Sequence, residues 1–186
     1  MIYFIFLISI MLHESGHLII AKILKIKIKN LKFNFIGFSA EFDNNISNKK
    51  SEKILVLIFG PLVNLFISIL FLVNKIDCDY NVEIIYTNLI LFVFNILPIL
   101  PLDGGRILFY IFSFRFNIEK SFEIINCISK VFLAIISVVY AIMIFMIKNI
   151  EIFFVIIYLW YLNIKEEVNF TWYIKINKKI RKYLNL

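Results

Sequence analysis

Long apolar stretches recur along the chain, and they constrain its fold more than any other feature. Of the 186 residues, 61% are hydrophobic and 18% are charged, too few polar side chains to cover an ordinary soluble domain. About 20 apolar residues let a helix cross a bilayer, so we expect an all-α polytopic membrane protein with about five transmembrane helices. The third is too long for one straight helix, and we expect Pro98 and Pro101 to break it. The predicted spans are residues 2–24, 54–73, 84–114, 131–147 and 150–164.

Lysines outnumber acidic residues between the first two predicted spans, and this asymmetry predicts the orientation of the helices. The positive-inside bias makes that segment cytoplasmic, and alternation of the spans then places the C-terminus in the cytoplasm as well. The excess of basic residues behind the net charge of +7 is therefore explained by the orientation of the helices in the membrane. We expect contact with the lipid bilayer and no binding of nucleic acid.

Two segments outside the spans have patterns of their own. Residues 166–186 place lysines opposite aromatic and aliphatic residues at helical intervals, which predicts a cytoplasmic basic amphipathic tail on an anionic leaflet. A solvated basic end is the alternative. We divide the chain accordingly into a transmembrane core, residues 1–165, and this tail. Residues 117–130 carry several charges and are predicted to form a solvated connector.

Apolar and polar residues largely alternate from Ile26 to Asp43, with an interruption at Ile36-Gly37. A period of two is typical of a β-strand, so we predict a short membrane-associated β-hairpin after the first span. Its exposed edge could accept an extended peptide as an added strand. The alternative is a sheet that only stabilises the fold at the membrane face.

Both histidines of the chain lie in one stretch, His13-Glu14-Ser15-Gly16-His17, inside the first predicted span. Residues four apart share a helix face, so His13 and His17 can offer two nitrogens to one metal ion, with Glu14 beside them. This spacing is typical of zinc proteases. Ionisable groups at membrane depth are costly to insert, which favours a function for the three side chains over a structural hydrogen-bonded trio.

A catalytic zinc needs three protein ligands and one open position. The third ligand must be a carboxylate or a cysteine because no further histidine exists, and Cys78 and Cys127 show no metal-binding spacing. Asp103 is the carboxylate candidate, since it lies in apolar surroundings after the proline-interrupted segment and before Gly104-Gly105, which let the chain turn closely. A helix N-cap at Asp103 is an alternative compatible with ligation.

Three elements of the chain resemble the site-2 proteases, the intramembrane zinc metalloproteases of peptidase family M50. They are the stretch from His13 to His17, the sequence Gly60-Pro61-Leu62-Val63-Asn64, and the Asn-Pro-Asp-Gly element from Asn95 to Gly105.

The resemblance implies one zinc ion per chain, held by His13, His17 and Asp103, with Glu14 as the catalytic base. It also implies that Asn95 contacts the substrate backbone, and the alternative is that Asn95 satisfies carbonyls freed by the nearby proline. For Asn64 of the second element, we favour interhelical hydrogen bonding over a role in the site.

The stretch from Asn95 to Ser113 and the pair Glu166-Glu167 resemble the sporulation branch of the family more narrowly. That branch implies a membrane-associated sigma-factor precursor of the pro-sigma-K type as substrate, and inhibitory membrane partner proteins. It also implies a location in the bacterial cytoplasmic membrane, on the mother-cell side around the forespore. Members of this branch often carry a C-terminal CBS domain, which these 186 residues do not include, so we do not expect nucleotide-linked control through one.

On this hypothesis the chain is a zinc metalloendopeptidase. Zinc would acidify a water molecule and polarise the peptide carbonyl. Glu14 would take the proton of the attacking water and pass it to the leaving amine. Two alternatives stay open: a protease with another substrate, such as an anti-sigma factor or a signal-peptide remnant, and a non-catalytic membrane scaffold or transporter.

Overall fold

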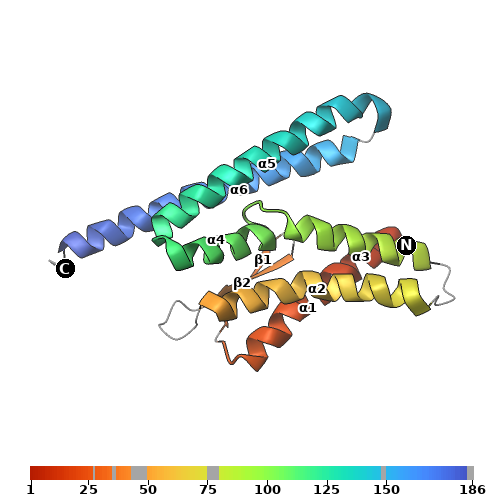
Figure 1. The fold of residues 1–186 in the computed structure, drawn as a ribbon, viewed down its shortest axis with the longest axis horizontal. Coiled ribbons are helices and arrows are strands. Elements are labelled where there is room, and N and C mark those ends of the chain that lie inside the picture. The colour runs from red at the N-terminus through yellow and green to blue at the C-terminus, as the bar shows by residue number, and fades with distance from the viewer. Residues whose placement is uncertain (27, 35–36, 43–49, 75–79, 148–149, 184–186) are drawn as a thin grey trace. The chain divides into compact units, whose positions relative to one another are not determined.

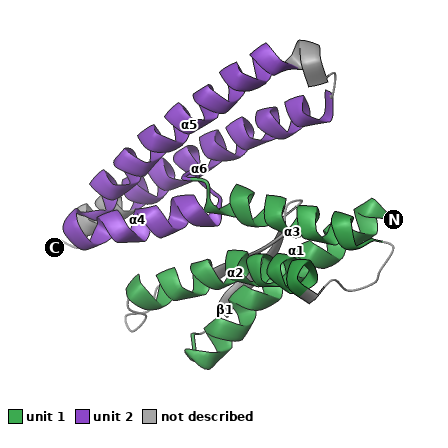
Figure 2. Cartoon of the chain, turned by 45° about the vertical axis from the view of Figure 1, so that its right-hand side comes forward, with its two compact units in different colours: residues 1–97 green, residues 98–186 purple. Residues whose placement is uncertain are grey.

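The computed structural model describes residues 1–26, 28–34, 37–42, 50–74, 80–147 and 150–183 (Figure 1). Within them the chain forms six helices and two short strands. The elements are α1 (Ile2–Ile23), β1 (Ile28–Asn34), β2 (Gly37–Phe42), α2 (Lys50–Asn74), α3 (Asn81–Ile96), α4 (Asp103–Arg115), α5 (Ile118–Ile147) and α6 (Ile150–Tyr183). They divide into two compact units, Met1–Leu97 and Pro98–Leu186 (Figure 2).

Three helices of the described part are long and apolar enough to cross a membrane. They are α1, α2 up to Val73, and the part of α5 from Ile118 to Met143. Helix α3 is apolar but shorter. The fold class is therefore all-α with several candidate spans, as predicted, and the count of five transmembrane helices stays a prediction.

Unit 1 has the inside-out polarity of a membrane protein. On α2, Phe66 is 65% exposed whereas Asn64, two residues earlier, is fully buried. Similarly, Ser9 on α1 and Asn88 on α3 are buried while most of the large apolar side chains on these helices point outward. Apolar outer faces suit lipid, and polar side chains between helices can hydrogen-bond there.

Helix α1 ends in a Schellman motif. Lys25 adopts a positive φ of 54°, the N–H of Ile26 donates to the carbonyl of Ala21 at 2.9 Å, and the N–H of Lys25 donates to that of Lys22 at 3.1 Å. These bonds satisfy carbonyls that the helix end would leave free. Ile26 then packs with Ala21 and with Val56 of α2, so the end of the site helix is fixed against its neighbour.

Strands β1 and β2 pair antiparallel, with Lys32 opposite Ser39 and Phe33 opposite Phe38. The register shifts between Ile28 and Asn30. Residues 35–36, between the two strands, lie outside the described residues, so the predicted hairpin stays a prediction.

The third predicted span consists of two helices, α3 and α4, separated by residues 97–102. The break at the prolines is confirmed. Leu97, directly before Pro98, has an extended backbone with ψ of 139°, because a proline ring disfavours helical backbone in the residue before it.

The prediction of a solvated connector at residues 117–130 is wrong, because nearly all of this segment belongs to α5. Asn117 caps the helix by accepting the N–H of Lys120 at 2.8 Å. Phe122 and Ile125 are buried, so the segment has an apolar face that its charges concealed.

Helices α5 and α6 of unit 2 lie side by side and antiparallel (Figures 1 and 2). Phe122 and Phe170 stack with ring centroids 3.8 Å apart, and Trp160 donates to Ser137 at 3.1 Å.

Helix α6 continues past residue 165, so the boundary predicted between core and tail falls inside one helix and stays a prediction. Side chains after Ile176 lie outside the described residues.

Candidate functional site

His13 and His17 lie one turn apart on α1, and their rings meet. The two Nε2 atoms are 3.1 Å apart and the ring planes are nearly perpendicular, at 86°. A tetrahedral zinc with bonds of about 2.0–2.1 Å would hold two nitrogens about 3.3 Å apart. The separation of the two Nε2 atoms is therefore close to the one that a shared zinc ion requires.

The backbone of α2 sets the orientation of His17. Nδ1 of His17 lies 2.8 Å from the carbonyl oxygen of Val56. A carbonyl can only accept, so Nδ1 carries the proton and Nε2 keeps the lone pair that a metal needs. Sequence reasoning missed this partner because Val56 acts through its backbone, and no side-chain pattern indicates that.

Two glycines bring α1 and α2 into contact at the site. A Cβ at Gly60 would lie 2.2 Å from Nε2 of His17, so the missing side chain is the space that the imidazole occupies. A Cβ at Gly16 would lie 2.8 Å from the carbonyl oxygen of Phe59. Small residues allow such close approach of membrane helices. Gly60 belongs to the Gly-Pro-Leu-Val-Asn sequence that resembles the family, but that resemblance did not indicate that Gly60 leaves space for the His17 ring.

Glu14 follows His13 on α1 and is half-buried. On a helix it is rotated by about 100° from His13, so it lies beside the face that carries the two imidazoles. This is where a base acting next to bound metal is expected, and its role stays a prediction.

Asp103 is the first residue of α4 in unit 2 and is 9% exposed. The N-cap position belongs to Leu102, whose side chain cannot cap, so the alternative that Asp103 is the N-cap is wrong. A carboxylate in the first turn of a helix interacts favourably with the helix dipole.

The predicted ligands are thus two imidazoles in unit 1 and one carboxylate in unit 2. Two imidazoles and one carboxylate are donor types that suit a catalytic zinc ion, and their assembly into one site stays a prediction.

Asn95 and Asn64, the two asparagines considered in the sequence analysis, differ in their hydrogen bonding. Nδ2 of Asn95 donates to the carbonyl of Leu91 at 3.0 Å, within its own helix α3. The carbonyl of Phe94, four residues before Pro98, accepts the N–H of Leu97 instead. Asn64 is fully buried, and neither of its amide atoms hydrogen-bonds to a described residue, so the expected interhelical hydrogen bond is not observed there.

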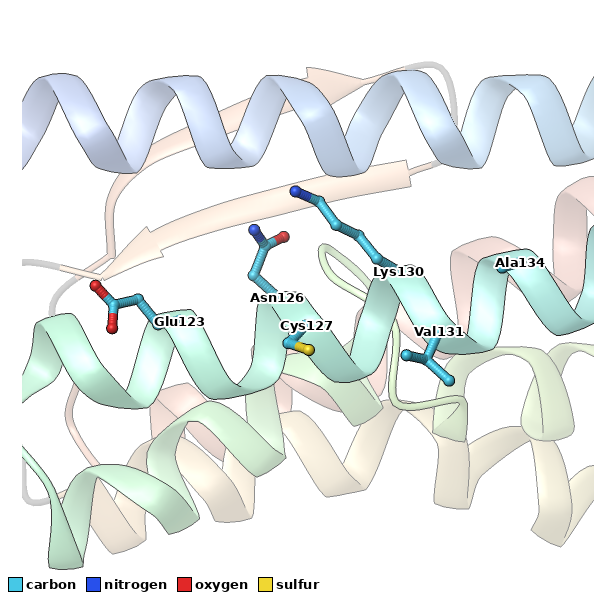
Figure 3. A pocket seen from close by; sticks show the side chains of 6 residues that line it. All are labelled: Glu123, Asn126, Cys127, Lys130, Val131 and Ala134. Atoms are coloured by element: carbon cyan, nitrogen blue, oxygen red, sulfur yellow. The ribbon is translucent and has the colours of Figure 1, made fainter.

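An open hollow of about 480 Å³ lies along α5 (Figure 3). None of the residues that line it is a predicted ligand, base or substrate contact, so we do not assign the site to it. The lining residues are Glu123, Asn126, Cys127, Lys130, Val131 and Ala134.

Comparisons with known proteins agree with this geometry. The sequence profile of peptidase family M50 matches residues 80–139. A zinc metalloprotease of Methanocaldococcus jannaschii is 35% identical over 136 residues, which are 69% of this chain and 39% of that protein. Stage IV sporulation protein FB of Bacillus subtilis is 29% identical over 120 residues, 62% of this chain and 41% of that protein.

The solved structure of a site-2 protease from Methanocaldococcus jannaschii has a similar fold. It matches with a TM-score of 0.70 and 29% identity, over 88% of this chain and 76% of that chain. With the three membrane-length helices, this likeness identifies a multi-pass membrane protein. The chain spans only about two fifths of the length of the two sequence relatives, 39% and 41%. The chain is thus similar to peptidase family M50, the site-2 protease family of zinc metalloproteases, in its sequence profile, its relatives and its fold.

Proposed function

We propose that the chain is an intramembrane zinc endopeptidase that hydrolyses a peptide bond in or near a membrane-associated segment of another protein. His13, His17 and Asp103 hold one zinc ion, and Glu14 is the general base. The observation that carries the proposal is the pair of Nε2 atoms 3.1 Å apart, with the second nitrogen of His17 already bonded to Val56.

Each residue has a defined task in the reaction. Zinc, when bound, acidifies a water molecule and polarises the scissile carbonyl. Glu14 takes the proton of the attacking water and then passes it to the leaving amine, which needs a carboxylate within reach of both. The hydrogen bond from Nδ1 of His17 to the Val56 carbonyl orients the ring, and Nε2 of the neutral ring is then the atom that can bind the metal.

A peptide in a helix hides its scissile bond, so the substrate must bind in extended form. The two strands offer a possible edge for such a peptide, and β2 contacts the site helix α1. The amide of Asn95, at the last turn of α3, is the proposed contact with the substrate backbone.

For the substrate we propose a sigma-factor precursor, by the likeness to the sporulation branch and to stage IV sporulation protein FB. An anti-sigma factor or a signal-peptide remnant is the second candidate for the same chemistry. Co-expression with each candidate, followed by detection of the cleaved product, distinguishes them.

We further propose a location in the bacterial cytoplasmic membrane with the C-terminus inside, an inhibitory membrane partner, and the division into a core at 1–165 and a tail at 166–186.

The experiment that tests the function compares the wild type with Glu14→Gln, both purified in detergent. Both proteins are expected to bind about one zinc per chain, because Glu14 is not a ligand, and only the wild type is expected to cleave. Equal cleavage by the two proteins would contradict the role of Glu14. Zinc binding without cleavage of any candidate by the wild type would favour a non-catalytic scaffold.

A further inference from the structure

Two buried polar side chains hold the backbone of Leu100, three residues before Asp103. The N–H of Leu100 donates to Oγ of Ser129 on α5 at 2.9 Å, and its carbonyl accepts Nδ2 of Asn163 on α6 at 3.3 Å. Both polar side chains are fully buried. The side chain of Leu100 packs against Phe122 in the same unit, so the residue is fixed from several directions.

The fixed residue is coupled to the start of α4. The N–H of Leu102 donates to the carbonyl of Ile99 at 2.8 Å, which closes a turn directly before Asp103. A Cβ at Gly105 would lie 2.6 Å from the carbonyl carbon and oxygen of Ile99. The first turn of α4 therefore lies directly against the held segment, and neither can shift without the other.

Stability alone does not explain why Asn163 is at this position. Its Oδ1 makes no hydrogen bond to a described residue, and a buried amide with one unsatisfied atom is less favourable than an apolar side chain of similar volume. What the amide does supply is a donor aimed at the carbonyl of Leu100. Ser129 likewise could be satisfied by Ile125 of its own helix, at 2.8 Å, without contacting Leu100.

We propose that Ser129 and Asn163 are positioning residues that hold Asp103 in place for metal binding. The inference rests on the proposed function, in which Asp103 is the third ligand. Substitution of residues that orient a ligand without touching the metal typically lowers metal affinity by about 10–100-fold.

The test measures zinc affinity of the full-length chain in detergent, by competition with a chelator. Ser129→Ala and Asn163→Leu are each expected to weaken zinc binding by about 10-fold or more. Cobalt substituted for zinc gives a visible spectrum that depends on ligand geometry, and both variants are expected to change it. A loss of packing elsewhere in the unit would not alter that spectrum.

The same pair of helices offers matched controls. Ser137 on α5 also bonds to a carbonyl of its own helix, Leu133 at 2.7 Å, and also contacts α6 by accepting from Trp160. Ser137→Ala and Trp160→Phe remove a comparable interhelical hydrogen bond without touching Leu100. Zinc affinity and the cobalt spectrum are expected to stay within about twofold of the wild type in both controls.

Asp103→Ala separates failure of this inference from failure of the proposed function. Wild-type zinc affinity in Asp103→Ala would remove Asp103 as a ligand, and the proposed function would fail with it. A weakened Asp103→Ala together with wild-type affinity and spectrum in Ser129→Ala and Asn163→Leu would overturn only the positioning role.

A double variant adds a stricter criterion. If Ser129 acts through Asp103, Ser129→Ala is expected to have no further effect on zinc affinity once Asp103 is alanine, whereas additive losses would overturn the inference. Should Ser129→Ala not fold, Ser129→Cys keeps the volume and weakens the hydrogen bond. A smaller loss of affinity is then expected, and no loss would overturn the inference.

Discussion

The crossing of α1 and α2 and the segment before α4 position their site residues by different physical means. At the crossing, a side chain is missing: Gly60 leaves the space in which the His17 imidazole lies. Before α4, side chains are added, since Ser129 and Asn163 hydrogen-bond the backbone of Leu100. The space beside Gly60 limits where the His17 ring can lie, whereas the hydrogen bonds to Leu100 limit how its backbone is oriented. The two regions should therefore respond differently to the same substitution.

The largest expected effect is that of Gly60→Ala. The new methyl group would lie 2.2 Å from Nε2 and 2.3 Å from Cε1 of His17, so the imidazole must leave its place and its bond to Val56. We expect zinc affinity to fall by about 100-fold, the upper end for groups that orient a ligand. The free energy of unfolding should change by no more than about 1 kcal/mol, because a ring moves rather than backbone.

Chelator competition measures the affinity, and denaturation in detergent measures the stability. Leu62→Ala is the control, since Leu62 lies on the same helix with 40% of its surface exposed. Wild-type zinc affinity in Gly60→Ala would show that the imidazole does not depend on this space.

Gly105→Ala is expected to have an intermediate effect of another kind. Its methyl group would lie 2.6 Å from the Ile99 carbonyl and 2.7 Å from the nitrogen of Leu100, so backbone must move. We expect both quantities to fall together: zinc affinity by about 10-fold, and the free energy of unfolding by about 1–3 kcal/mol. Ile111→Ala, on the exposed side of α4, should change neither. Unchanged stability in Gly105→Ala would contradict the tight packing before α4.

The smallest expected effect is that of Lys130→Met. Nζ of Lys130 lies 3.0 Å from Oε1 and 2.8 Å from Oε2 of Glu167, but the two side chains are 41% and 38% exposed. Such pairs contribute at most about 1 kcal/mol, so the shift in thermal unfolding should be small and zinc affinity unchanged. A large loss of stability would mean that the ion pair, rather than the stacked Phe122 and Phe170, determines how α5 and α6 align.

Much of the membrane fold could be predicted because apolar length is a local property of the chain. Helix α1 and the histidine pair followed from spacing alone, and Pro98 marked the end of regular helix. The connector prediction failed because charged residues such as Glu123 were counted while the apolar face of Phe122 and Ile125 was not.

The positioning contacts could not be predicted from the sequence in the same way. His17 and Val56 are 39 residues apart, and Asn163 and Leu100 are 63 apart. Both contacts involve a backbone carbonyl, which every residue has, so neither leaves a pattern in the side chains. A buried serine or asparagine in an apolar helix was the one available signal, and it does not identify its partner.

The most direct test of the central claim is the X-ray absorption spectrum of zinc bound to the purified chain. Two imidazoles and a carboxylate predict nitrogen and oxygen neighbours at about 2.0–2.1 Å, with the outer-shell scattering of two rings. In His17→Ala the ring scattering should fall by about half. A sulfur neighbour at about 2.3 Å, or ring scattering unchanged by His17→Ala, would contradict the proposed metal site.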